Sequence, residues 1–202
     1  GVAHVVQLFA TYLQTRNARQ TLWVCMEYVE GGSLMDYMKK TGQPLQDRVV
    51  RVALRHACTA LRVMHGIGHI HRDVKSANLL FNADGVVKLA DLGEVAWTSA
   101  ATGGVAEGMR GTPYFMAPEC AMGLQYTSKV DAWSVGILAI ELAETKPPHH
   151  DMHPMRVMFL IATEDGEPPA LAEPAQHVAE FAAFLRRALV YEPAQRASVD
   201  EL

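Results

Sequence analysis

The octet HRDVKSAN at residues 71–78 brings a carboxylate, a cation and an amide close together in the chain. A carboxylate such as Asp73 can orient an attacking hydroxyl and accept its proton, and a cation such as Lys75 can neutralise a phosphoryl group in transfer. Asn78 and the later Asp91 supply oxygen atoms, which are the ligands that Mg²⁺ prefers. Phosphoryl transfer from a nucleotide needs this set of groups.

The octet and the later tripeptide DLG resemble two linked motifs of protein kinases, H-R-D-x-x-x-x-N and D-F-G. Two further segments resemble the family in the same order. GTPYFMAPE at residues 111–119 is similar to the segment that receives the peptide substrate, and DAWSVG at residues 131–136 is similar to the start of the central helix. Arg196 falls where the late arginine of the family lies.

Three other segments are similar to the sterile-type serine/threonine kinases, with the germinal-centre and Hippo-like kinases nearest. They are GGSL at 31–34, IELAETKPP at 140–148 and DMHPMR at 151–156. The resemblance implies transfer of the γ-phosphate of ATP, with Mg²⁺, to a Ser or Thr hydroxyl of a protein substrate. It also implies an upstream activating kinase as a possible partner.

The resemblance assigns catalytic roles to Asp73, Lys75, Asn78 and Thr112. It implies that Thr112 hydrogen-bonds near Asp73 and Lys75 and helps to shape the substrate site. Asn78 and Asp91 are implied to share the metal ion, and together with Lys75 they are implied to bind the phosphates of the nucleotide.

Adenine recognition is implied for the residues that follow the segment TLWVCM at 21–26. Met26 is implied to lie at the back of the pocket, and Leu80 to form its apolar floor. The carbonyl of Glu27 and the backbone amide of Val29 are implied to meet the edge of the adenine ring.

Three charged residues outside these sets are expected to support the fold. Asp131 is expected to accept hydrogen bonds from the backbone amides of residues 71–72, because a buried carboxylate requires donors. Glu119 and Arg196 are expected to form a buried ion pair, in which the loss of one partner leaves a lone charge.

The segment before the GTP tripeptide departs from the pattern of the resembled kinases. They often carry a phosphorylatable Thr three residues before the glycine, where this chain has Gly108. One hypothesis is that Glu107 partly replaces the phosphate as a partner of Arg72. A second is that a nearby hydroxyl is phosphorylated instead: Thr98, Ser99 or Thr102. A third is that the loop is unregulated.

The composition is that of an ordinary globular protein: 202 residues, 50% of them hydrophobic and 20% charged. A net charge of −4 argues against nucleic acid as the main partner. We find no apolar run long enough to cross a membrane. The three cysteines are scattered, which is typical of reduced thiols and favours a cytoplasmic location.

The hydrophobic pattern predicts two hairpins and several helices. Residues 5–12 and 21–28 are expected to pair around a turn at 16–20, and residues 79–81 and 86–90 around a second turn. A helix is expected over 46–65, preceded by a short helix with a capping box at Ser33 and Asp36. Residues 91–117 are expected to be a long loop, followed by helices broken at the later prolines.

The expected fold class is α+β and protein-kinase-like, mainly the helical large lobe with a remnant of the small β lobe. We expect residues 1–28 to be remnant small-lobe strands and the start of the hinge. Residues 29–202 are expected to be the end of the hinge and the large lobe, with an incomplete final helix.

The chain as given carries no G-x-G-x-x-G before Val2 and no V-A-I-K, so we expect it to transfer phosphate poorly by itself. The alternative is a catalytically inactive truncated kinase or pseudokinase that acts as a protein-interaction module.

Overall fold

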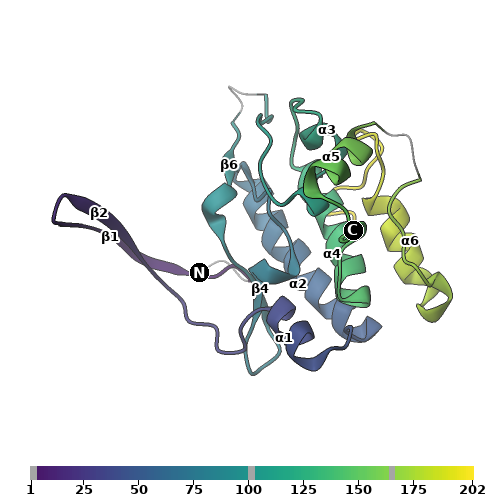
Figure 1. Ribbon diagram of the computed structural model, residues 1–202, viewed down its shortest axis with the longest axis horizontal. Coiled ribbons are helices and arrows are strands. Elements are labelled where there is room, and N and C mark those ends of the chain that lie inside the picture. The colour runs from purple at the N-terminus through teal and green to yellow at the C-terminus, as the bar shows by residue number, and fades with distance from the viewer. Residues whose placement is uncertain (1–3, 100–102, 164–166) are drawn as a thin grey trace.

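The computed structural model describes residues 4–99, 103–163 and 167–202. It consists of a helical body from which one long hairpin projects (Figure 1). Within the body, α2 (Asp47–Gly66) packs against α4 (Lys129–Glu144) near the centre. In the described residues, no helix combines the length and the apolar character that a membrane span needs.

The projecting hairpin is formed by β1 (Leu8–Arg16) and β2 (Arg19–Met26), which pair antiparallel. Its turn is shorter than the expected turn at 16–20, since only Asn17 and Ala18 connect the two strands. Their φ values are 50° and 58°. Left-handed values at both positions match the right-handed twist of a hairpin, so the polar residues beside the turn extend the ladder.

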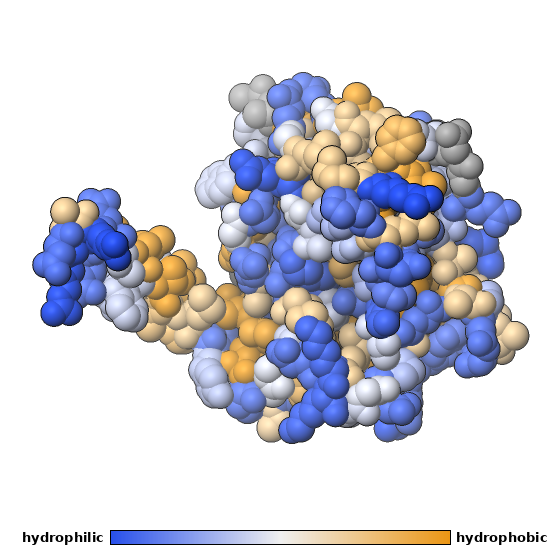
Figure 2. Space-filling model, viewed as in Figure 1, coloured by the Kyte–Doolittle hydropathy of each residue, from blue (hydrophilic) through white to orange (hydrophobic). Residues whose placement is uncertain are grey.

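Apolar side chains on the hairpin face solvent, and Figure 2 shows them gathered on the part nearer the body, with a hydrophilic tip. Leu13 and Leu22, which pair across the strands, are 64% and 63% exposed. The base is held by the backbone: Val6 donates to the carbonyl of Leu89 at 2.9 Å, and Leu89 donates to that of His4 at 2.7 Å.

The two helices expected in the first half of the chain are confirmed. α1 (Leu34–Thr41) begins after Ser33, whose hydroxyl oxygen accepts from the amide of Asp36 at 3.0 Å and donates to its carboxylate at 2.7 Å. α2 covers 20 residues and buries one apolar face. Its buried residues are Val50, Ala53, Leu54, Ala57, Ala60, Leu61 and Met64.

Helix α4 forms the core of the body, because nearly all of its side chains are buried, whichever way they point. Gly136 allows close packing there, since a Cβ atom at this position would lie 2.7 Å from the side chain of Leu189. The helices around α4 are shorter: α3 (Pro118–Ala121), α5 (Pro154–Ala162) and α6 (Ala179–Ala188).

Prolines start several of the late elements, and the breaks expected at the later prolines lie between or after the helices. The 3-10 turns η4 (Pro113–Phe115) and η5 (Pro174–Gln176), like α3 and α5, begin with proline. Proline is favourable at this position because its missing N–H has no partner inside a helix in any case.

Short elements surround the octet at residues 71–78. The strands are β3 (His69–Ile70), β4 (Leu79–Phe81), β5 (Val87–Leu89) and β6 (Ala96–Trp97), and the 3-10 turns are η1 (Ser76–Asn78) and η2 (Leu92–Glu94). The expected hairpin of β4 and β5 is confirmed. The expected loop over 91–117 is more ordered than predicted, because β6 pairs with β3.

Candidate active site

The backbone that leads into the octet is fixed by one buried carboxylate. Asp131, in the first turn of α4, accepts from the amides of His71 and Arg72, each at 2.8 Å. Nε2 of His65 lies 2.7 Å from the same carboxylate. Burial alone would raise the pKa of Asp131, but the His65 contact and the backbone donors outweigh it and hold this pKa below its usual value. The expected contact is confirmed, and it positions Arg72 with a left-handed φ of 70°.

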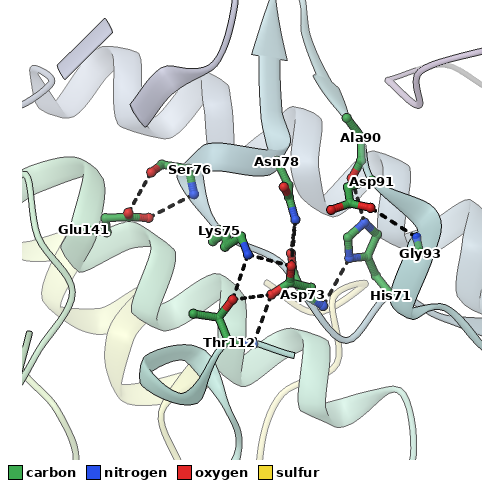
Figure 3. A network of polar contacts seen from close by, with 10 residues as sticks. All are labelled: His71, Asp73, Lys75, Ser76, Asn78, Ala90, Asp91, Gly93, Thr112 and Glu141. Atoms are coloured by element: carbon green, nitrogen blue, oxygen red, sulfur yellow. Dashed lines mark hydrogen bonds and ion pairs between the residues drawn. The ribbon is translucent and has the colours of Figure 1, made fainter. Parts of the chain in front are cut away.

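Asp73 lies at the centre of the polar network in Figure 3. Its Oδ1 accepts from the amide and the hydroxyl of Thr112, at 3.1 and 2.6 Å. Its Oδ2 accepts from Nζ of Lys75 at 2.7 Å and from Nδ2 of Asn78 at 3.0 Å. The structure thus brings together the four residues to which the sequence assigned catalysis.

These donors keep the Asp73 carboxylate ionised. Burial acts to raise its pKa, but hydrogen bonds from Lys75, Thr112 and Asn78 hold the pKa below its usual value. A carboxylate that is ionised at neutral pH can accept a hydrogen bond from a hydroxyl group and so orient it.

The segment that carries Thr112 is held against the octet at very short range. Nζ of Lys75 also donates to the Thr112 hydroxyl at 2.7 Å, a contact that the resemblance implied. The preceding Gly111 has a φ of 104°, and a Cβ atom there would lie 2.2 Å from the carbonyl oxygen of Arg72. Only glycine fits this close approach, which places residues 111–112 beside Asp73.

Asn78 and Asp91 are brought together by the β4–β5 hairpin. Leu79 pairs with Leu89, and Ala90 donates to the backbone carbonyl of Asn78 at 2.8 Å. The Asn78 side chain donates through its nitrogen to Asp73, while Oδ1 of Asp91 accepts from the amide of Gly93 at 3.2 Å.

This donor set fits magnesium rather than a metal held by the protein alone. A carboxylate and an amide oxygen suit a hard cation that takes its other ligands from phosphates and water. The described residues contain no group of three or more His, Cys, Asp or Glu that could hold a metal ion.

The residues implied for adenine binding are only partly gathered. Val29 is buried in a small cluster with Val6 and Ala90, and Leu80 packs against it. Met26, the last residue of β2, is 51% exposed and lies outside this cluster.

Glu27, which directly follows β2, is held by polar contacts. Its carboxylate pairs with Lys88 and accepts from the amide of Gln7 at 3.1 Å. The hydrogen bond from Lys88, and to a smaller extent the one from the Gln7 amide, lowers the pKa of this half-buried acid. Its own amide donates to the carbonyl of Gln7 at 2.8 Å, so the residue connects both hairpin strands to β5.

A buried contact beside Lys75, between Ser76 and Glu141, was not predicted from the sequence. Glu141 of α4 accepts from the amide of Ser76 at 2.9 Å and from its hydroxyl at 2.6 Å (Figure 3). Burial raises the pKa of Glu141, despite these two donors. An acidic residue inside the apolar stretch of α4 was the available signal, because a buried carboxylate needs donors nearby.

The hypothesis that Glu107 pairs with Arg72 is wrong. The Glu107 carboxylate accepts from Nε2 of Gln125 at 2.5 Å, and Arg72 donates instead to the Tyr126 hydroxyl at 3.0 Å and to the carbonyl of Glu94. The cause is geometric: the chain presents the carbonyl groups of residues 107–108, not the Glu107 side chain, to this region.

The alternative phosphorylation sites remain hypotheses. The Thr98 hydroxyl donates to the carbonyl of Gly68 at 3.0 Å. Ser99 takes part in a further interaction within the chain, and Thr102 lies outside the described residues.

The expected ion pair between Glu119 and Arg196 is confirmed. Nη1 and Nη2 of Arg196 donate to the two carboxylate oxygens at 2.7 and 2.9 Å, in a bidentate arrangement. Both side chains are buried, and the pair connects the end of the GTPYFMAPE segment to a bend that follows α6.

Comparison with known proteins agrees with this geometry. The family model described as protein kinase domain matches residues 2–202. The chain is 39% identical over 193 residues to serine/threonine-protein kinase cst-1 of Caenorhabditis elegans, covering 96% of this chain and 37% of that protein. It is 40% identical over 202 residues to mitogen-activated protein kinase kinase kinase kinase 3 of Homo sapiens, covering 98% and 22% respectively.

A third relative is serine/threonine-protein kinase 4 homolog A of Dictyostelium discoideum, 39% identical over 192 residues, which are 95% of this chain and 41% of that protein. The chain therefore spans less than half the length of the curated relatives that it matches. It belongs to the protein kinase domain family, in the sterile-type serine/threonine branch that these relatives represent.

Proposed function

We propose that the protein to which this chain belongs transfers the γ-phosphate of ATP to a Ser or Thr hydroxyl of a protein substrate. The observation that carries the proposal is the convergence of Lys75, Asn78 and Thr112 on the single carboxylate of Asp73. Family membership supports the reaction type.

In this proposal Asp73 orients the acceptor hydroxyl. Its oxygen attacks the γ-phosphorus, the bond from that phosphorus to the bridging oxygen of ADP breaks, and the hydroxyl proton passes to Asp73. Among the described residues, four protein groups already donate to the two carboxylate oxygens of Asp73, so the acceptor hydroxyl must share or displace one of them. Lys75 is the donor best suited to move, because its flexible cation also suits a phosphate oxygen.

Two further groups complete the proposed nucleotide site. Asn78 and Asp91 would hold Mg²⁺, which when bound neutralises charge on the phosphates. The Glu27 carbonyl and the Val29 amide would meet the adenine edge, with Leu80 below the ring and Met26 at the back of the pocket. The adenine assignment is supported by the apolar cluster of Val6, Val29, Ala90 and Leu80. This cluster includes Ala90, the residue directly before Asp91.

Partners and location are proposed on more general grounds. A protein with exposed Ser or Thr is the proposed substrate, and an upstream kinase is a possible activator. A cytoplasmic site of action is supported by the scattered cysteines, which are typical of a reducing compartment.

The test is Asp73→Asn in the full-length protein, with transfer of labelled phosphate from ATP to a Ser/Thr peptide library as the readout. We expect turnover to fall by about a hundredfold or more, because the variant cannot accept the proton. Asp84→Asn, in the exposed turn between β4 and β5, is the matched control and should keep full activity. A wild-type protein that transfers no phosphate, or an Asp73→Asn variant that remains active, would contradict the proposal.

A further inference from the structure

Tyr126 connects two parts of the site that are far apart in the sequence. Its side chain lies between the octet and the segment that leads to Thr112, and the residue is 2% exposed. Arg72, which directly precedes Asp73, donates to the Tyr126 hydroxyl oxygen at 3.0 Å. The same hydroxyl donates to the carbonyl of Gly108 at 2.8 Å, and the carbonyl of Glu107 lies 3.2 Å away.

The backbone of Tyr126 reinforces this connection. The amide of Ala106 donates to the Tyr126 carbonyl at 2.8 Å, and the amide of Tyr126 donates to that of Ala106 at 3.0 Å. Residues 106–108 are therefore held by one tyrosine through both its main chain and its side chain. A few residues later the chain reaches Thr112, which donates twice to Asp73.

The Arg72 guanidinium has no carboxylate partner among the described residues, since none of the ion pairs there includes it. Its partners are neutral oxygen atoms, the Tyr126 hydroxyl and the carbonyl of Glu94. Gly108 offers no hydroxyl to modify, and the Glu107 carboxylate is turned to Gln125. The positive charge of Arg72 is thus connected to residues 107–108 through a neutral group, the Tyr126 hydroxyl.

Tyr126 can fill this role at neutral pH, because its hydroxyl stays protonated. Burial raises the pKa of Tyr126, an effect that outweighs the hydrogen bond from Arg72. A protonated phenol can accept from Arg72 and donate to Gly108 at the same time.

We propose that Tyr126 is a positioning residue that holds residues 106–112 against Arg72 and Asp73 without a phosphate group. The expected effect on kcat/KM rests on the proposed function, whereas the expected ordering of residues 106–112 does not. It predicts a phosphorylation-independent arrangement of the segment that presents Thr112.

The experiment compares wild type with Tyr126→Phe, which removes only the hydroxyl, in the full-length protein. We expect amide hydrogen exchange over residues 107–112 to become about tenfold faster, and kcat/KM for the peptide library to fall about tenfold or more, with KM for ATP unchanged. The melting temperature, measured in parallel, separates local release from global unfolding. Tyr37→Phe, at a half-exposed position on α1, is the control. It should change neither the hydrogen exchange of residues 107–112 nor kcat/KM for the peptide library.

Two further measurements keep the proposal decidable. Arg72→Gln removes the donor of the Arg72–Tyr126 hydrogen bond, so it should raise the rate of amide hydrogen exchange over residues 107–112. Combining it with Tyr126→Phe should raise that rate little further, because both changes break the same contact. Phosphatase treatment of wild type should leave turnover intact. Unchanged exchange in both variants, or loss of turnover after phosphatase treatment, would overturn the proposal. If wild type transfers no phosphate, the proposed function fails, while hydrogen exchange still decides the role of Tyr126.

Discussion

At the scale of single residues, Glu141 makes stability depend on pH. Its carboxylate is buried against Ser76, and burial raises its pKa. A raised pKa in the folded state means that this residue contributes stability below its unfolded pKa, and that the contribution is lost as pH rises through the folded pKa. We expect Glu141→Gln, which keeps an acceptor for the Ser76 amide, to gain stability relative to wild type as pH rises from about 4.5 to 7.

Urea unfolding at several pH values measures this effect. Glu167→Gln, at an exposed position, is the control and should follow the wild-type profile across the same range. A difference in unfolding free energy between Glu141→Gln and wild type that stays constant with pH would show that Glu141 is not the titrating group.

The residues around Asp73 show how far the sequence reaches at this scale. The contacts of Thr112 and Lys75 were predictable because the resemblance to protein kinases implies them, and that of Asp131 because a buried carboxylate requires donors. The partner of Arg72 was not, because it depends on the backbone path of residues 106–108, and the sequence does not reveal which side of a loop faces inward. Ser76 and Glu141 were missed for the same reason: their contact joins a loop to a helix.

At the scale of elements, the β1–β2 turn carries a removable strain. Ala18 adopts a φ of 58°, a left-handed conformation that costs a residue with a Cβ atom roughly 1–2 kcal/mol. Glycine has no such cost, and Asn-Gly is the preferred pair for this kind of turn. We expect Ala18→Gly to slow amide hydrogen exchange along β1 and β2, measured residue by residue.

Ala10→Gly supplies the opposite expectation in the same hairpin. Ala10 pairs with Cys25 between the two strands and has no left-handed φ. Glycine at this position would therefore relieve no strain and would only increase the conformational entropy that the chain loses on folding. Its hairpin amides should therefore exchange faster than those of wild type. Faster exchange in Ala18→Gly as well would mean that the turn is not strained.

The elements themselves were predictable to different degrees. Helix α2 was located almost to the residue, because its apolar face repeats over five turns and a glycine follows. The strands were less well located, since polar residues near the β1–β2 turn looked like loop although a tight turn keeps them paired. The pairing of β6 with β3 was missed, because strands of two residues carry no periodicity.

At the scale of the whole molecule, α4 is the element to which distant segments attach. Asp131 at its start holds the backbone of His71 and Arg72, and Glu141 near its end holds Ser76. Since α4 is buried along its length, both carboxylates have fixed positions, and the octet is held at two points. The shape of the site therefore depends on core packing as well as on its own hydrogen bonds.

The Glu119–Arg196 pair extends this dependence to the end of the described chain. Arg196 donates to both Glu119 oxygens and to the carbonyls of Val190, Tyr191 and Lys129. We expect Arg196→Ala to lower the unfolding free energy by about 3–5 kcal/mol, because it leaves a buried carboxylate without its partner. Denaturant unfolding at constant pH measures the loss, which is a large part of the usual stability of a domain.

An exposed ion pair in the same molecule gives the matched control. Nε of Arg62 and Oδ1 of Asp200 lie 3.9 Å apart, and both side chains are more than half exposed. Asp200→Asn should cost less than about 1 kcal/mol, because water screens such a pair. The double variant Glu119→Gln/Arg196→Ala leaves neither charge of this pair buried, so it should be more stable than Arg196→Ala alone. Equal losses for the buried and exposed pairs would mean that the contact between Arg196 and Glu119 does not stabilise the fold.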